Sequence, residues 1–167
     1  YVMDLKNNKR GRIKDYASEY NVEYLEGQRP WSIKCDLAIP CATQNELDDS
    51  DAKELIKNGC QAVAEGANMP TTPEAVELFH DNNVLFGPGK AANAGGVATS
   101  QFEMAQNASM QKWRAEQVDE KLQQVMKSIF DTISATAKQY SNEHDLVLGA
   151  NIAGFERVAD ASPVSSL

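Results

Sequence analysis

Three short apolar segments, separated by spaces that each hold one helix, place the strongest limit on how this chain folds. They cover residues 34–39, 62–64 and 84–86. Such spacing is typical of units in which a crossover helix joins two parallel strands. The sequence therefore predicts an α/β fold that is built on a parallel sheet.

Capping residues mark a helix in each gap between the predicted strands. In the first gap, residues 49–51 offer an N-cap and Gly59 stands at the C-cap. In the second gap, Thr72 caps a helix whose first residue is Pro73. These signals support an alternating order of strands and helices.

Further elements are expected outside the sheet. Residues 1–8 and 12–20 have apolar residues at helical spacing, and residues 22–25 indicate a short strand. From residue 118 to residue 133, apolar side chains recur at every third or fourth position, which is typical of a long amphipathic helix that packs through this stripe. A last helix is predicted over residues 146–161.

The last predicted helix carries three small residues, which are Gly149, Ala150 and Gly154. Small side chains permit two elements to approach closely. We therefore expect this helix to make a close contact elsewhere in the fold. The tail after it, residues 162–167, is expected to be frayed.

A stretch rich in small residues, GPGKAANAGGVATS, follows the third predicted strand at residues 87–100. Gly95 and Gly96 stand inside the helix predicted there, where each glycine costs about 1 kcal/mol relative to alanine. Such a pair is typical of a place where a ligand or another backbone comes close. Residues 87–92 also match the G-x-G-x-x-A dinucleotide pattern, although Pro88 restricts the turn.

Small residues also dominate the segments that follow the three predicted strands, at residues 40–43, 66–68 and 87–89. In a parallel sheet, ligands bind beyond the carboxyl ends of the strands, and these ends lie along one edge. The sequence therefore predicts a binding site at that edge. It does not indicate an acid, a base or a nucleophile there.

Composition narrows the possible partners of this 167-residue chain. Its formal net charge of -8 argues against nucleic acid and anionic membranes. We expect neither a membrane span nor a signal peptide, because no apolar run has the required length or place. Cys35, Cys41 and Cys60 lack metal-ligand spacing, so they are expected to be reduced, mostly buried thiols of a cytoplasmic protein.

A basic cluster near the amino terminus contrasts with the acidic remainder of the chain. It consists of Lys6, Lys9, Arg10, Arg12 and Lys14. One interpretation is a pair of solvated helix ends, where cations complement the helix dipole. The other interpretation is an anion-binding site.

Four segments of the chain resemble the carboxyl-terminal part of the hexameric, NADP-type glutamate dehydrogenases. They are PWSIKCDLAIPCATQNEL at 30–47, AVAEGANMPTTPEA at 62–75, GPGKAANAGGVATSQFEMAQNA at 87–108 and GANIAGFERVADA at 149–161. The similarity extends from about residue 6 to residue 161.

The resemblance implies a partial Rossmann-like domain over residues 1–110 that lacks its first βαβ unit. Residues 111–167 would form a helical segment that packs back toward a separate, absent substrate domain. The catalytic lysine and aspartate of the family belong to that absent domain. The chain is therefore expected to be an inactive part of a longer enzyme.

The implied activity is the interconversion of L-glutamate with 2-oxoglutarate and ammonia, by hydride transfer with NADP(H) rather than NAD(H). A cytoplasmic homohexamer is the implied assembly. The alternative is a non-catalytic, truncated Rossmann-like module for binding or assembly, in which the stripe at 118–133 would contact a partner.

The resemblance also implies roles for nine residues. Seven are expected to contact the cofactor: Ala42, Thr43, Asn68, Asn93, Lys6, Lys9 and Arg12. Of these, Lys6, Lys9 and Arg12 are expected to contact its 2′-phosphate. Those expected to line the glutamate pocket are Val97 and Ser100, with the Ser100 hydroxyl on the side-chain carboxylate of the substrate. Gly95 and Gly96 would then let nicotinamide and glutamate approach the backbone, and residues 87–89 would be a turn rather than a pyrophosphate loop.

Overall fold

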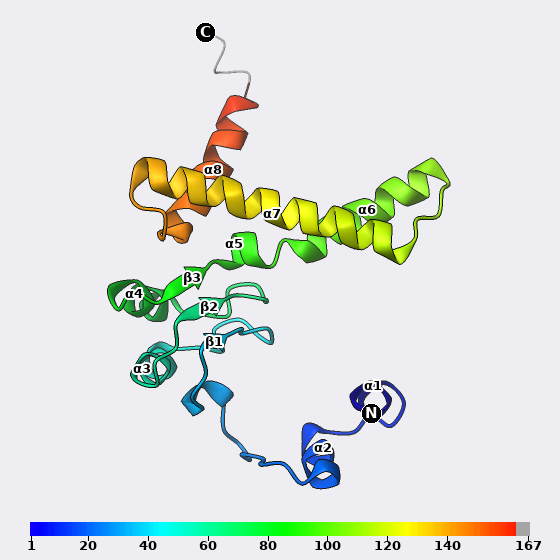
Figure 1. The fold of residues 1–167 in the computed structure, drawn as a ribbon, viewed down its shortest axis with the longest axis vertical. Helices are drawn as coiled ribbons and strands as arrows, with labels where there is room; N and C mark the ends of the chain where they lie inside the picture. The colour runs from blue at the N-terminus through cyan, green and yellow to red at the C-terminus, as the bar shows by residue number, and fades with distance from the viewer. Residues whose placement is uncertain (163–167) are drawn as a thin grey trace. The chain divides into compact units, whose positions relative to one another are not determined.

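The computed structural model describes residues 1–162 and divides the chain into two units. The first unit covers residues 1–30, and the second begins at Trp31. Figure 1 shows the ribbon with the α-helices and strands labelled; a 3-10 helix over Pro30–Ser32 is not labelled. The expected boundary between residues 110 and 111 lies inside the second unit, so the assignment of residues 1–110 to a cofactor domain stays a prediction.

The first unit contains the two predicted helices, α1 (Val2–Asn7) and α2 (Ile13–Tyr20). Helix α2 ends at Asn21, whose φ of 50° is left-handed. The strand predicted for residues 22–25 is wrong, because this segment is irregular. A strand needs a partner strand, and the described part of this unit offers none.

The second unit is organised around a sheet of three parallel strands in the order β1-β2-β3. The strands are β1 (Leu37–Ala38), β2 (Ala62–Ala64) and β3 (Leu85–Gly87). The α/β class and the parallel arrangement are thus confirmed.

Strand β1 is shorter than predicted and is not buried on both sides. At its start, the chain bends at Asp36, whose carbonyl accepts hydrogen bonds from the amides of Gln61 and Ala62. Shortly after its end, Pro40 has no amide to donate to a ladder. Leu37 remains 63% exposed, so the sheet has an uncovered apolar side chain.

Two crossover helices lie side by side on one face of the sheet (Figure 1). Helix α3 (Asp49–Lys57) joins β1 to β2, and helix α4 (Pro73–Asp81) joins β2 to β3. The Thr72 cap and Pro73 are confirmed for α4. For α3 the N-cap is Asp48 rather than a residue in 49–51, because the Asp48 side chain accepts from the Ser50 and Asp51 amides.

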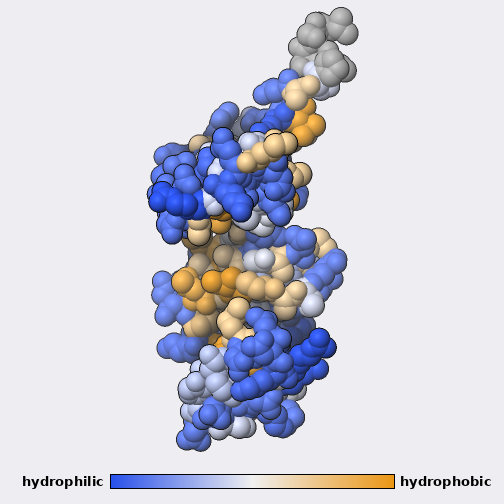
Figure 2. Space-filling model, turned by 90° about the vertical axis from the view of Figure 1, so that its right-hand side faces the viewer, coloured by the Kyte–Doolittle hydropathy of each residue, from blue (hydrophilic) through white to orange (hydrophobic). Residues whose placement is uncertain are grey.

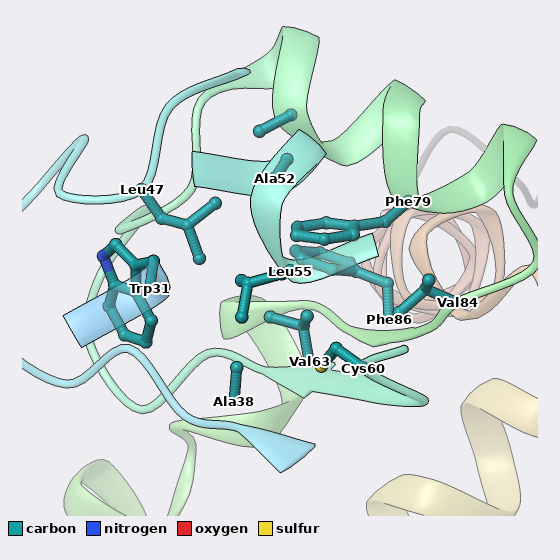
Figure 3. Close-up of a cluster of buried hydrophobic side chains, with 11 residues drawn as sticks. Trp31, Ala38, Leu47, Ala52, Leu55, Cys60, Val63, Phe79, Val84 and Phe86 are labelled. Carbon is teal, nitrogen blue, oxygen red and sulfur yellow. The ribbon is translucent and has the colours of Figure 1, made fainter. Parts of the chain in front are cut away.

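The main core fills the space between these helices and the sheet (Figure 3). Its buried members are Trp31, Ala38, Leu47, Ala52, Leu55, Cys60, Val63, Ala75, Phe79, Val84 and Phe86. The rings of Phe79 and Phe86 stack with their centroids 6.0 Å apart. This core fixes the positions of the strands and thereby of the loops at their carboxyl ends.

After β3 the chain forms two helices where one was predicted, α5 (Gly89–Ala92) and α6 (Gly95–Ser109). The break falls at Asn93 and Ala94. Gly95 and Gly96 therefore lie in the first turn of α6 and not inside a longer helix. This placement corrects the sequence interpretation and lowers the cost of the glycine pair.

Helices α7 (Ala115–Tyr140) and α8 (Leu146–Asp160) confirm the predicted long amphipathic helix and the last helix. The stripe of α7 packs only in part: Ile133 is buried, whereas Phe130 is 54% exposed. Gly149 is the close contact that the sequence predicted, since α8 crosses the backbone of α7 there. Gly154, in contrast, faces open space.

No helix among residues 1–162 is long and apolar enough to cross a membrane. The predicted fraying concerns residues 162–167, of which only Ser162 lies within the described residues.

Candidate functional site

The loops after β1 and β2 are joined by backbone hydrogen bonds at the carboxyl edge of the sheet. The Gly66 amide donates to the Pro40 carbonyl at 2.9 Å, and the Leu47 amide donates to the Pro70 carbonyl at 2.9 Å. The predicted convergence of small-residue loops on one edge is therefore confirmed for these two strands.

Glu65 connects the loop after β2 to the loop after β3. This residue directly follows β2 and is only 6% exposed. Its Oε2 accepts a hydrogen bond from the Gly89 amide at 2.6 Å, and its Oε1 accepts one from the Thr71 amide at 3.2 Å. A buried carboxylate is tolerated where such bonds satisfy it. Glu65 thus holds the start of α5 in place.

Glu65 was not predicted as a site residue, although the chain carries a signal for it. An acidic residue that directly follows a buried strand cannot reach water easily, so it must find hydrogen-bond donors nearby. The amide of Gly89 is one such donor. An added Cβ at Gly89 would lie 3.1 Å from Glu65 Oε2 and 3.1 Å from the Ala67 carbonyl, so glycine suits this close packing.

The side chains of Asn68 and Asn93, both predicted to contact the cofactor, are hydrogen-bonded to each other. Asn93 Nδ2 donates to Asn68 Oδ1 at 2.6 Å and to the Ala67 carbonyl at 2.9 Å. Because its nitrogen is used in this way, the Oδ1 atom of Asn93 is the group that it can offer to a ligand. The asparagine pair links the β2 loop to the end of α5.

An open cleft of about 480 Å³ lies beside this asparagine pair. The residues around it come from the β2 loop, from α5 and from the start of α6: Gly66, Ala67, Asn68, Lys90, Asn93, Ala94, Gly96 and Val97. Val97 is 66% exposed. The structure therefore brings together three of the predicted site residues, namely Asn68, Asn93 and Val97.

The two glycines at the start of α6 have different surroundings. An added Cβ at Gly95 would meet Leu122 Cδ1 of α7 at 3.5 Å, which is an ordinary contact. An added Cβ at Gly96 would meet nothing within 4 Å. Gly96 thus leaves the backbone uncovered at the cleft, whereas Gly95 faces α7.

The remaining predicted residues of the second unit lie near this cleft but do not line it. Ser100 is exposed one turn beyond Gly96, and its Oγ donates to the Gly96 carbonyl at 3.2 Å. Ala42 and Thr43 are exposed in the loop after β1, where the Ala42 amide donates to the Glu46 carboxylate at 2.8 Å.

Two cations of the basic cluster pair with carboxylates inside the first unit. Lys9 Nζ lies 3.1 Å from Asp4, and Lys14 Nζ lies 3.1 Å from Glu26. The hydrogen bond from Asn8 and the charge of Lys9 lower the pKa of Asp4, and Asp4 in turn raises the pKa of Lys9. The predicted phosphate contacts of Lys6, Lys9 and Arg12 stay predictions.

The three thiols differ in burial. Cys60 is buried, Cys35 is half-buried and Cys41 is exposed, so the expectation of mostly buried thiols is wrong for Cys41.

Among the described residues, no group of three or more His, Cys, Asp or Glu side chains could hold a metal ion. The carboxyl edge offers amide groups, hydroxyls and uncovered backbone, which suit binding and orientation.

Comparisons with known proteins agree with this architecture. The family described as Glutamate/Leucine/Phenylalanine/Valine dehydrogenase matches residues 1–165. An NADP-specific glutamate dehydrogenase of Escherichia coli K12 is 56% identical over 160 residues, and an NAD(P)-specific glutamate dehydrogenase of Xylanibacter ruminicola is 53% identical over 165 residues. Each alignment covers 96% of this chain and 36% of the relative.

A solved structure is similar over the same part. The crystal structure of the glutamate dehydrogenase of Plasmodium falciparum superposes with a TM-score of 0.92 at 51% identity. The match covers 95% of this chain and 34% of that protein. The chain thus spans about one third of the length of the relatives that it matches.

Proposed function

This chain belongs to the Glutamate/Leucine/Phenylalanine/Valine dehydrogenase family, and on that basis we propose that it acts as part of an NADP-dependent glutamate dehydrogenase. The proposed reaction is the oxidative deamination of L-glutamate to 2-oxoglutarate and ammonia, together with its reverse. Residues 1–110 would belong to the cofactor domain, and residues 111–167 would pack toward a substrate domain outside this chain.

The observation that carries the proposal is the cleft at the carboxyl edge of the parallel sheet. Asn68 and Asn93 meet there, and the backbone at Gly96 is uncovered. This is the edge at which parallel α/β sheets bind nucleotides. Uncovered backbone and amide groups fit a flat nicotinamide carboxamide, which needs both a hydrogen-bond donor and an acceptor.

The proposed roles of the residues follow from these positions. Bound NADP+ would supply the acceptor for the hydride that leaves the α-carbon of glutamate. Asn93 and Asn68 would orient the nicotinamide side, and the loop at Ala42 and Thr43 would extend along the cofactor. In the first unit, the 2′-phosphate would be bound by Lys6, Lys9 and Arg12.

The substrate would lie over the start of α6. Val97 is exposed beside the cleft and would contact the aliphatic part of glutamate. Ser100 would turn its hydroxyl from the Gly96 carbonyl to the side-chain carboxylate. A homohexamer in the cytoplasm completes the proposal, and the odd number of cysteines, without the spacing of a disulfide framework, supports a reducing compartment.

Substitution of Ser100 by alanine tests the substrate part of the proposal in a protein of the full family length that contains this chain. A hydrogen bond to a charged group contributes about 1.5–3 kcal/mol, so KM for glutamate and 2-oxoglutarate should rise about tenfold to a hundredfold. The kcat value should change less, since the bond exists in both the bound and the transition state.

Thr99→Ala is the matched control for this substitution. Thr99 is also exposed in α6, and its Oγ1 likewise donates to a carbonyl one turn earlier, that of Gly95 at 2.9 Å. Its KM values should stay within about twofold of the unchanged protein. Equal KM values for Ser100→Ala and Thr99→Ala would remove Ser100 from the glutamate pocket.

A second candidate function is that of a non-catalytic module for binding or assembly. Large apolar side chains remain exposed in the second unit, among them Leu37, Ile39 and Phe130. Figure 2 shows that hydrophobic side chains gather on part of the surface in this view. Such surface is typical of a contact with another protein.

Calorimetry with NADPH and a turnover assay separate the two candidates. We expect the 167-residue chain alone to bind NADPH weakly and to show no glutamate turnover, while a protein of full family length reduces NADP+ with glutamate. Absence of both turnover and NADPH binding in the full-length protein would favour the module. Turnover by the 167 residues alone would show that catalysis needs no group outside this chain.

A further inference from the structure

Two cysteines lie beside each other where β1 and β2 begin. The two strands are in parallel register with Leu37 opposite Ala62. Cys35 and Cys60 each stand two residues before this pair, and their two thiols lie close enough to interact. The Gln61 and Ala62 amides donate to the Asp36 carbonyl at 2.8 Å and 3.3 Å, so the two segments are joined at Asp36 and Gln61, the residues directly after the two cysteines.

The side chains of both cysteines turn toward the same core. Cys60 is a buried member of the main core, and Cys35 packs against that core from a half-buried position. The Cys60 thiol lies between the strands, with its Sγ 3.7 Å from the Asp36 carbonyl and 3.3 Å from the Ala62 carbonyl. Burial, followed by the neighbouring Cys35 thiol, raises the pKa of Cys60.

We propose that Cys35 and Cys60 form a reversible disulfide that ties β1 to β2 when a hydroperoxide oxidises the protein. Neighbouring strands are about 4.8 Å apart, and disulfides join Cα atoms that are about 4.4–6.8 Å apart. Register and spacing therefore suit the bond. This inference does not depend on the proposed function.

The chemistry begins at Cys35, because its half-buried thiol is the accessible one of the pair. Its sulfur, as thiolate, attacks the terminal peroxide oxygen, which breaks the O–O bond and forms a sulfenic acid. The other peroxide oxygen leaves and is protonated, as an alcohol from an organic hydroperoxide or as water from hydrogen peroxide. The Cys60 sulfur then attacks the sulfenic sulfur, loses its proton and displaces hydroxide, which leaves as water. The two thiols are oxidised by two electrons in total, and the peroxide is reduced.

The third cysteine serves as an internal control. Cys41 is exposed and lies beyond Pro40, at the opposite end of β1. Its side chain contacts Gly66 rather than either of the other thiols. Proximity in the folded chain therefore selects one of the three possible pairings.

Peptide mapping of the 167-residue chain tests the inference. After treatment with hydrogen peroxide and alkylation of the remaining thiols, we expect two of the three thiols to be lost. A cross-linked Cys35–Cys60 peptide should appear, with Cys41 alkylated, and dithiothreitol should restore all three thiols. The cross-link should persist in Cys41→Ser and disappear in Cys35→Ser.

The same treatment of the chain unfolded in urea shows whether the fold selects the pair, and it needs no variant. Unfolded chains should give a mixture of all three pairings. The inference fails if the folded chain gives that same mixture, if its cross-link involves Cys41, or if peroxide only adds oxygen to single cysteines.

Discussion

Substitution of Gly149 by alanine should lower the free energy of unfolding by about 3 kcal/mol, because it forces a methyl group into the contact between α7 and α8. The added Cβ would overlap the carbonyl oxygen of Ile133 and would lie 2.9 Å from Ala137 Cβ. The atoms in the way belong to the backbone and the first side-chain carbon of α7, so they cannot rotate away. Urea unfolding followed by circular dichroism measures the loss.

Gly154→Ala is the matched control, since it makes the same change in the same helix. An added Cβ at Gly154 meets nothing within 4 Å. Alanine is there the better helix former, so the free energy of unfolding should rise by about 0.5–1 kcal/mol. Equal losses in both variants would show that helix α8 does not pack against α7 through Gly149.

Substitution of Glu65 by alanine should cost about 3 kcal/mol of stability, because it removes the acceptor of two amides. The Gly89 and Thr71 amides would each lose a hydrogen bond in a buried place, and an unsatisfied buried donor costs about 1–3 kcal/mol. Glu65→Gln keeps one acceptor oxygen, so its loss should be about half as large. Thermal and urea unfolding measure the differences.

Glu77→Ala is a suitable control for Glu65→Ala, because Glu77 is an exposed residue of the neighbouring helix α4. Its effect should stay within about 0.5 kcal/mol. If Glu65→Ala is as mild as this control, water replaces the carboxylate at the two amides, and Glu65 does not hold the start of α5.

Local signals in the sequence were sufficient for most of the fold. The Thr72 cap and Pro73 are interactions within one helix turn, and they place α4 correctly. The alternation of strands and single helices likewise leaves only a parallel arrangement, as observed. Predictions failed where the local structure depends on a distant element. Residues 22–25, for example, form no strand because they have no partner strand.

The glycine pair shows a second kind of failure. Residues 87–100 suggested one helix with two glycines inside it, whereas the chain breaks at Asn93 and resumes at Gly95. The break follows from the hydrogen bonds of Asn93 to Ala67 and Asn68, which are residues of another loop. A pattern within one segment cannot reveal such a contact.

The candidate site was predicted in part from the pattern and in part from the family resemblance. Strand order placed it at the carboxyl edge of the sheet, and the resemblance supplied Asn68, Asn93 and Val97, which the structure brings to one cleft. Glu65 was missed because its role depends on the Gly89 amide, which comes from 24 residues further along the chain.

The open space at Gly96 has a consequence for how natural variation at this position should be interpreted. A Cβ atom there would meet no atom of another part of the fold within 4 Å, and alanine would favour the helix. Folding of this chain therefore gives natural selection no steric reason to retain glycine at residue 96. If glycine is nevertheless retained at this position in related organisms, the reason would be a molecule that binds at this surface, either a ligand or a neighbouring protein.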